Sequence, residues 1–116
     1  MINSLCHFEL VTANKDKCKD FYGDVFGWEF DEKRMPGYTL IQTGQEPGGG
    51  ILPAEGREVP AGLNAYFGVD DIDACLRKVA AHGGEVLVPK TPIPNVGHFA
   101  IFSDPEGITI GIMQPS

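Results

Sequence analysis

Two side chains suited to acid–base chemistry and metal binding lie close together near the N-terminus. His7 and Glu9 belong to the segment Leu5 to Val11, whose alternating residues are typical of a β-strand. Side chains two positions apart in a strand point to the same face, so His7 and Glu9 share one. A neutral imidazole can accept a proton, contact a ligand or hydrogen-bond to Glu9. We therefore expect His7 to be a base, a ligand contact or a structural group.

The other histidines and the cysteines are weaker candidates. His98 lies in a predicted strand whose facing the pattern leaves open, because Phe99 and Ile101 compete for burial. His82 falls at a predicted helix C-terminus, where the helix dipole favours a cation and a structural role. Three cysteines are expected to be buried structural thiols rather than nucleophiles: Cys6, Cys18 and Cys75.

The elements that must position these residues begin with a strand and a helix. Asn14 can cap a helix over residues 15–26, and Gly27 can end it in a left-handed conformation. Further strands are predicted at residues 28–30, 38–43 and 48–52, the last weakened by its glycines.

The same order then returns. After a strand at residues 63–69, Asp71 can cap a helix over residues 72–82, which Gly83 and Gly84 end. The later elements are a strand at 85–88, a proline-rich loop at 89–94, and strands at 98–103 and 108–113 joined by the turn 104–107.

A constant offset relates the two series of elements. Six pairs are each 57 positions apart: His7 and Asn64, Leu10 and Phe67, Asn14 and Asp71, Cys18 and Cys75, Tyr22 and Val79, Gly27 and Gly84. One offset thus aligns a strand, a helix cap and a helix end, which indicates internal duplication. We predict one α+β domain with module one at 1–54, a linker at 55–62 and module two at 63–116.

Composition fits a single globular domain and excludes several partners. The chain has 116 residues, 42% hydrophobic and 22% charged. Its net charge of −7 argues against nucleic acid and anionic membrane as partners. No apolar run approaches the roughly 18 residues of a membrane span, and the start lacks a secretory pattern. With an odd number of unclustered cysteines, a cytoplasmic location is expected.

The strand face away from the helices is the predicted binding face, because each helix can cover only one side of its sheet. If the two half-sheets curl toward each other, a cleft with few polar groups on apolar walls results. Seven residues are expected to line it: His7, Glu9, Asn64, Tyr66, His98, Thr109 and Met113.

Four segments form a pattern that is fairly specific when they are taken together. They are residues 7–10 (HFEL), 21–28 (FYGDVFGW), 67–73 (FGVDDID) and 104–107 (DPEG). Over nearly the whole chain this resembles the vicinal oxygen chelate superfamily, which includes glyoxalases, bleomycin resistance proteins and extradiol dioxygenases. The resemblance implies paired βαβββ modules in a cupped partial barrel, and often a homodimer.

Enzymes of this superfamily usually hold a divalent ion through His, Glu or Gln on the first and last strands of each module. By resemblance, His7 matches one ligand position, whereas Asn64 stands where His is common and Gly111 where Glu is common. Residues 48–54 offer neither imidazole nor carboxylate, and Glu55 is the nearest candidate. Because first-row metals normally need three protein ligands, we predict that the metal is absent and favour no cofactor.

A rebuilt metal site is the alternative. His7, Glu9 and His98 would make a two-histidine, one-carboxylate set of the kind that non-haem iron oxygenases use. A divalent metal therefore stays a second hypothesis beside the metal-free one.

The favoured function is a glyoxalase- or bleomycin-resistance-like protein that binds a small, partly apolar molecule without the family metal. The alternative is a metal-dependent lyase, isomerase or dioxygenase resembling lactoylglutathione lyase, or an enzyme with His7 as base. A third hypothesis is an assembly subunit, because exposed sheet edges invite pairing between chains. Sequence does not name the ligand, because one scaffold supports many functions.

Overall fold

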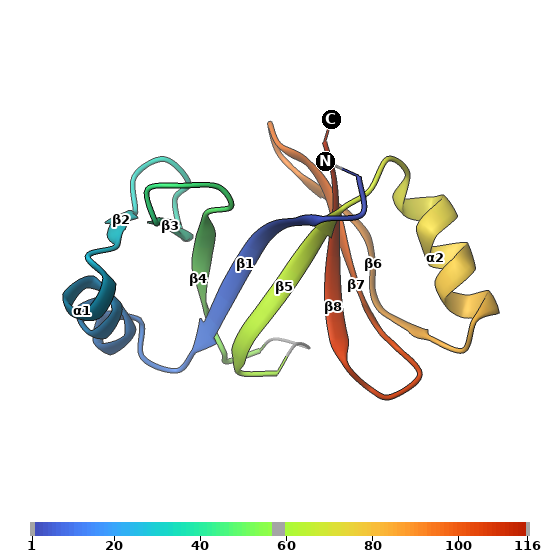
Figure 1. Cartoon of the computed structure of the whole chain (residues 1–116), viewed down its shortest axis with the longest axis horizontal. Coiled ribbons are helices and arrows are strands. Elements are labelled where there is room, and N and C mark those ends of the chain that lie inside the picture. Colours follow the sequence, from blue (N-terminus) through green and yellow to red (C-terminus); the bar gives the residue numbers. More distant parts are fainter. Residues whose placement is uncertain (1, 57–59, 116) are drawn as a thin grey trace. The chain divides into compact units, whose positions relative to one another are not determined.

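The computed structural model describes residues 2–56 and 60–115 (Figure 1). Part of the predicted linker, residues 57–59, lies outside the described residues. The elements are β1 (Leu5–Thr12), α1 (Lys15–Phe26), β2 (Glu29–Asp31), β3 (Thr39–Gln42), β4 (Gly49–Pro53), β5 (Gly62–Gly68), α2 (Ile72–Ala81), β6 (Glu85–Ile93), β7 (Gly97–Ser103) and β8 (Thr109–Pro115).

The predicted α+β fold with βαβββ order in each half is confirmed. Strand order is β2-β3-β4-β1 in the first series and β6-β7-β8-β5 in the second. In both, the first strand pairs in parallel with the last, and the remaining pairs are antiparallel. The chain forms two compact units. We call His7–Asn64 the first half, and Ala65–Ser116 with Met1–Cys6 the second half.

Both helices begin where the sequence predicts. The Asn14 side chain accepts a hydrogen bond from the Lys17 backbone N–H, and Asp71 does the same for Ala74. Gly27 ends α1 with φ of 72°, a left-handed conformation that suits glycine. Among the described residues, no helix has the length and apolarity needed to cross a membrane.

The largest departure from the predicted elements is β6. It runs from Glu85 to Ile93 and so includes most of the segment predicted as a proline-rich loop. Prolines are tolerated because β6 pairs with β7 alone, and its register shifts between Val86 and Thr91. The prediction of a loop after Val88 was wrong because proline excludes central strands but not edge strands.

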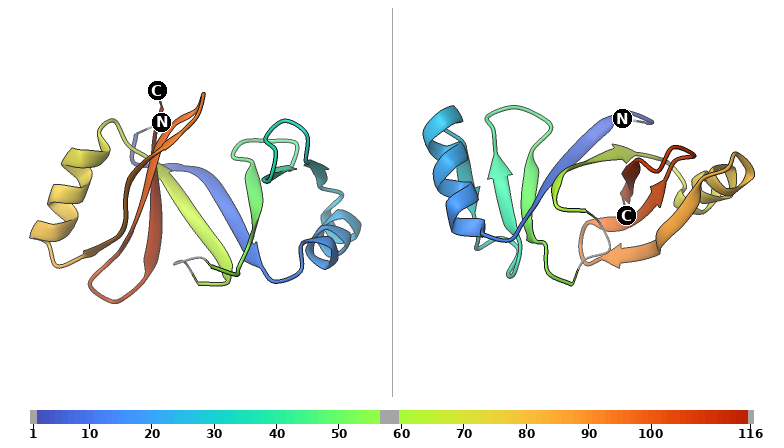
Figure 2. Two further views of the ribbon diagram at one scale, coloured as in Figure 1. Left: turned by 180° about the vertical axis from the view of Figure 1, so that it is seen from behind. Right: turned by 90° about the horizontal axis from the view of Figure 1, so that it is seen from below.

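In the second half, α2 packs across its strands and closes an apolar core (Figure 2). Ile72 at the start of α2 is fully buried, and Ala100 on β7 lies opposite Ile112 on β8. Val69 completes this cluster, and each fully buried aliphatic side chain stabilises the fold by about 1.5–3 kcal/mol.

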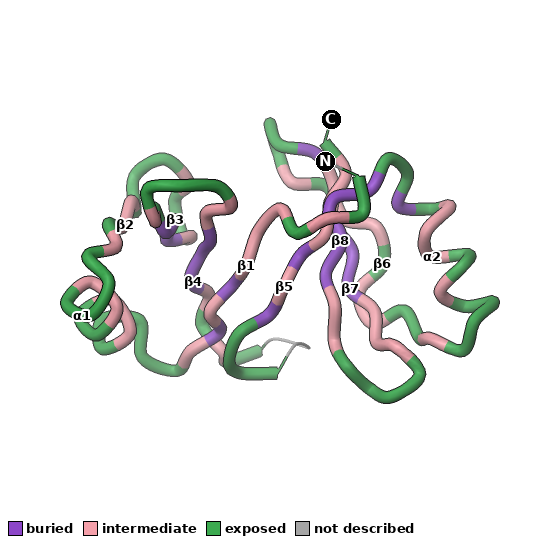
Figure 3. The backbone as a smooth tube through the Cα atoms, viewed as in Figure 1, coloured by how far each residue is buried: buried purple, intermediate pink, exposed green. Residues whose placement is uncertain are grey.

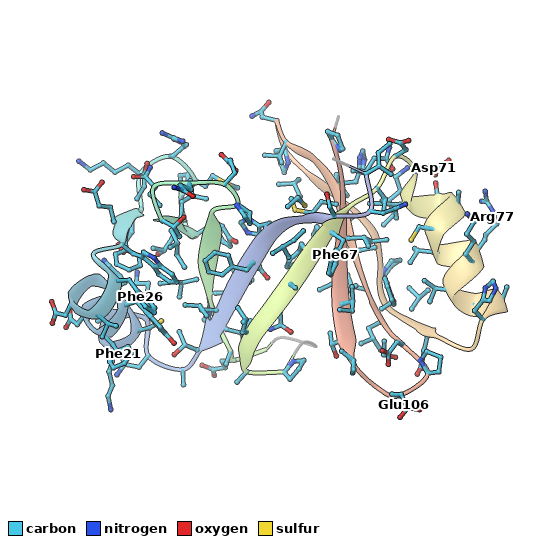
Figure 4. The ribbon with its side chains drawn as sticks, viewed as in Figure 1. Phe21, Phe26, Phe67, Asp71, Arg77 and Glu106 are labelled. Carbon is cyan, nitrogen blue, oxygen red and sulfur yellow. The ribbon has the colours of Figure 1, made fainter. Side chains whose placement is uncertain are left out.

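In the first half, α1 packs through aromatic rings rather than through a buried stripe. None of its residues is buried, as Figure 3 shows. Trp28 links the helix to the sheet, with ring centroids 5.3 Å from Tyr22 and 5.7 Å from Phe8. Phe21 and Phe26, labelled in Figure 4, are 58% and 60% exposed. The helix therefore presents an apolar outer surface.

Candidate functional site

A continuous hydrogen-bonded chain joins His7, Tyr38 and Glu9 within the first half. The Tyr38 hydroxyl lies 2.8 Å from His7 Nε2 and 3.0 Å from Glu9 Oε2. Glu9 is 7% exposed, so this carboxylate is one of the few buried acidic groups in the described part of the chain. Buried polar groups of this kind are retained when they are hydrogen-bonded, as here.

Strand register explains how Tyr38 meets two residues of β1 that are far from it in sequence. Gly50 on β4 lies between its partners Glu9 on β1 and Leu40 on β3. Directly paired residues share a face, and Tyr38 has the same parity as Leu40. Glycine at position 50 leaves room for the phenol, because a Cβ there would lie 1.8 Å from the Tyr38 hydroxyl.

This face is the one turned away from α1. Phe8, the residue between His7 and Glu9, points the other way: its ring contacts the backbone of Gly49 and tilts against Trp28. The prediction that His7 and Glu9 share the non-helical face of β1 therefore agrees with the packing of their neighbours. Val11, on the same face, is 2% exposed and supplies an apolar border.

The direction of the hydrogen bonds assigns a tautomer to His7. The Tyr38 O–H donates to the carboxyl oxygen Oε2 of Glu9. The Tyr38 oxygen then accepts from the Nε2–H of His7. Burial lowers the pKa of His7 below its ordinary value, which favours the neutral imidazole at neutral pH. The arrangement thus holds a neutral, oriented imidazole beside a buried carboxylate.

On the paired strands β5 and β8, a tyrosine ring also covers the corresponding glycine. Tyr66 pairs with Gly111, and its ring lies over that glycine: a Cβ at position 111 would be 2.4 Å from Tyr66 Cδ2. Tyr66 is 5% exposed. Asn64, two residues earlier on β5, donates from its side-chain amide to the Pro60 carbonyl at 3.1 Å.

The remaining predicted cleft residues divide between two faces. Thr109 and Met113 share parity with Gly111 on β8, so they lie on the face away from α2. His98 has the parity of Ala100, which packs in the α2 core, so it lies on the helix side. This placement weighs against His98 as a partner for His7 and Glu9, and the rebuilt site remains a prediction.

The residues present do not fit the divalent ion of the family. Within the described ranges, no group of three His, Cys, Asp or Glu side chains could hold a metal ion. Gly50 and Gly111 stand at corresponding register positions, and the rings of Tyr38 and Tyr66 fill the space that a longer side chain would need at either one. No chemical step through such an ion is derived for this chain.

A separate hollow of about 430 Å³ lies beside α1 in the first half. Apolar side chains dominate it, and the helix N-terminus supplies its polar end. Its lining is Leu10, Val11, Thr12, Asn14, Lys17, Cys18, Phe21, Tyr22, Gly62 and Leu63. Leu10 and Thr12 have the opposite parity to His7, so their side chains reach this hollow from the α1 side of β1, whereas Val11 borders it and also belongs to the His7 face.

Tyr38 is the site residue that the sequence analysis missed. It directly precedes β3, and the sequence pattern predicts it only as the first residue of a strand. The glycines at positions 48–50 carry the signal, because glycine inside a strand often marks the close approach of another group. Tyr38, an aromatic residue two positions before the Gly50 partner Leu40, is the natural candidate for that group.

Sequence comparison matches residues 4–112 to the Glyoxalase/Bleomycin resistance protein/Dioxygenase superfamily. A protein named putative glyoxylase CFP32, from Mycobacterium tuberculosis, is 34% identical over 111 residues, which cover 93% of this chain and 42% of that protein. The anthracycline biosynthesis protein DnrV of Streptomyces peucetius is 27% identical over 128 residues, covering 92% and 45%. The chain thus spans less than half the length of these relatives.

Solved structures share the fold at low identity. Methylmalonyl-CoA epimerase from Mycobacterium tuberculosis has a TM-score of 0.69 and 17% identity, covering 97% of this chain and 88% of that one. A hypothetical protein, BH1468, of Bacillus halodurans has a TM-score of 0.71 and 15% identity, covering 98% and 95%. The family match over most of its length, together with the repeated βαβββ order, shows that this chain belongs to the glyoxalase/bleomycin resistance protein/dioxygenase superfamily.

Proposed function

We propose that the chain binds a small, partly apolar molecule on the strand face that carries His7 and Glu9, and that it does so without the family metal. The observation that carries this proposal is the hydrogen-bonded chain through Tyr38. It sets polar groups of fixed direction on a strand that also buries Val11. Ligand sites commonly combine a few oriented polar groups with apolar walls.

The names of the relatives support an organic ligand. One is named an anthracycline biosynthesis protein, and anthracyclines are fused-ring aromatic molecules that carry hydroxyl groups. An aromatic hydroxyl could donate to, or accept from, the polar groups of this face while its rings contact apolar side chains. We therefore choose alizarin, a fused-ring hydroxyquinone, as the probe.

The test is calorimetric titration of alizarin into protein that has been dialysed against a chelator. We expect saturable binding with a dissociation constant in the micromolar range, about −8 kcal/mol. His7→Ala should weaken it by about two- to tenfold, the value of one hydrogen bond. His82→Ala is the matched control, because that imidazole is exposed at the end of α2 and bonded to Lys78 O.

Equal loss of affinity in both histidine variants would contradict the proposed face. Binding that occurs only after a divalent ion is restored would contradict the metal-free part of the proposal. If alizarin and two other fused-ring hydroxyquinones all fail to bind, the proposed ligand class is wrong.

A metal-dependent lyase is the second candidate function, and His7 at the retained family ligand position favours it. Its substrate would be the hemithioacetal of methylglyoxal and glutathione, and its assay is turnover with added Ni²⁺ or Zn²⁺. Turnover that depends on the metal and is abolished by His7→Ala would establish this function in place of the first. The homodimer and the cytoplasmic location stay predictions.

A further inference from the structure

The His7 face holds a phenol beside the one family ligand position that this chain retains. We propose that the Tyr38 hydroxyl fills the space beside His7 and Glu9 that an ion would need, so that Tyr38 excludes a divalent ion from this face even where a third ligand is supplied. This inference rests on the proposed metal-free function and names the residue responsible for it.

The first support is the position of the hydroxyl oxygen. It lies 2.8 Å from the imidazole nitrogen of His7 and 3.0 Å from a carboxylate oxygen of Glu9, and it bridges them. A transition-metal ion shared by an imidazole and a carboxylate lies about 2.0–2.2 Å from each ligand atom. The ion and the hydroxyl oxygen therefore compete for the same space between these two groups.

The second support is the position of Gly50. It is the register partner of Glu9, and the backbone there is covered by the phenol of Tyr38. A third ligand at this position would complete a set of one imidazole and two carboxylates on one face, a number of ligands that first-row metals accept. With Tyr38 in place, even a methyl group at position 50 would clash with the hydroxyl.

The test is titration of Zn²⁺ and Ni²⁺ into three proteins, followed by calorimetry and elemental analysis. The proteins are the wild type, Gly50→Glu and Tyr38→Ala/Gly50→Glu. We expect one equivalent of ion only in the Tyr38→Ala/Gly50→Glu protein, bound at least about 100-fold more tightly than by the wild type or by Gly50→Glu, in which Tyr38 is retained. His7→Ala should abolish this gain.

Two results would overturn the inference. One is a folded Tyr38→Ala/Gly50→Glu protein that takes up no more metal than the wild type. The other is a wild-type protein that binds one equivalent of ion, lost on His7→Ala, because the ion and the phenol would then coexist. Circular dichroism establishes folding, and if the double variant is unfolded, Tyr38→Ala/Gly50→Asp, with a shorter carboxylate, takes its place and must bind Zn²⁺ at least about 100-fold more tightly than the wild type.

The outcome is separable from that of the proposed function. Alizarin binding to the chelator-treated wild type tests the function without reference to Tyr38. If alizarin binds and the Tyr38 variants gain no metal, the proposed function stands and the role of Tyr38 fails. If the variants gain metal and no hydroxyquinone binds, the role of Tyr38 stands and the proposed ligand class fails.

Discussion

The two halves of this chain have the same topology and use it differently. In the second half, α2 begins with a fully buried Ile72 and closes an apolar core over β7 and β8. In the first half, α1 buries no residue, and the polar chain through Tyr38 lies on the other side of the sheet. A buried helix-to-sheet core is thus found in the second half, and the candidate polar site in the first.

The corresponding glycines make this difference concrete. Both Gly50 and Gly111 are covered by a tyrosine ring. Over Gly111 the ring comes from the register partner on the paired strand. Over Gly50 it comes from the segment before β3, and its hydroxyl lies between two ionisable groups. Duplicated units can therefore keep a backbone register while the covering ring comes from different segments.

The contrast between the two helices should produce the largest effect. Ile72→Ala removes a fully buried side chain and should lower the free energy of unfolding by about 2–5 kcal/mol. Phe21→Ala on α1 should cost about 1 kcal/mol or less, because that ring is largely exposed. Urea unfolding followed by circular dichroism measures both. Similar losses in the two variants would break the contrast.

The two covered glycines should be intolerant of alanine for the same steric reason. Gly50→Ala and Gly111→Ala should each cost about 1–3 kcal/mol, because the added methyl group meets a tyrosine. Gly23→Ala on α1 is the control: its new Cβ would make an ordinary 3.5 Å contact, and alanine favours helix. Thermal unfolding reports all three.

A double-mutant cycle sharpens this prediction. Tyr38→Ala should remove most of the cost of Gly50→Ala and none of the cost of Gly111→Ala, since Tyr38 covers only the first glycine. If Tyr38→Ala rescues neither variant, the clash at position 50 does not involve the phenol.

Loss of the bridging hydroxyl should have a smaller effect. Tyr38→Phe keeps the ring over Gly50 and removes the hydrogen bonds to His7 and Glu9, so we expect a loss of about 1–2 kcal/mol. Tyr22→Phe, in the aromatic cluster of α1, is the matched control and should change stability by about 0.5 kcal/mol or less. Equal effects would mean that the bridge contributes no more than an ordinary surface hydroxyl.

The smallest expected effect is a dependence of stability on pH. Because burial lowers the pKa of His7 in the folded state, the unfolded chain binds its proton more readily. This group therefore contributes stability that is present above the unfolded pKa of about 6.5 and is lost as pH falls toward the lower folded pKa. His7→Gln should flatten the slope of unfolding free energy against pH in that window. An unchanged slope would mean that other groups cause the pH dependence of stability.

Much of the fold could be predicted because local signals are strong. Asn14, Gly27 and Asp71 act through side chains or backbone angles of their own segments, so their roles follow from residue type. The face shared by His7 and Glu9 follows from strand alternation alone. These features need no knowledge of tertiary contacts.

The missed features depend on neighbouring strands. Tyr38 reaches Glu9 only because β4 places Gly50 between them, and no local pattern encodes that pairing. The same is true of β6, where Pro89 and Pro92 disfavour a strand locally. At the edge of a sheet the prolines are tolerated, because proline lacks a backbone donor and the outward donors of an edge strand need no partner.

The edge strands also bear on how the protein behaves in a crowded solution. An open row of backbone donors and acceptors is a template for further chains, and natural sheets limit this with short strands, prolines and irregular register. At one edge β2 has three residues, and at the other β6 carries prolines and shifts in register. Both edges therefore carry features that limit strand addition by other chains.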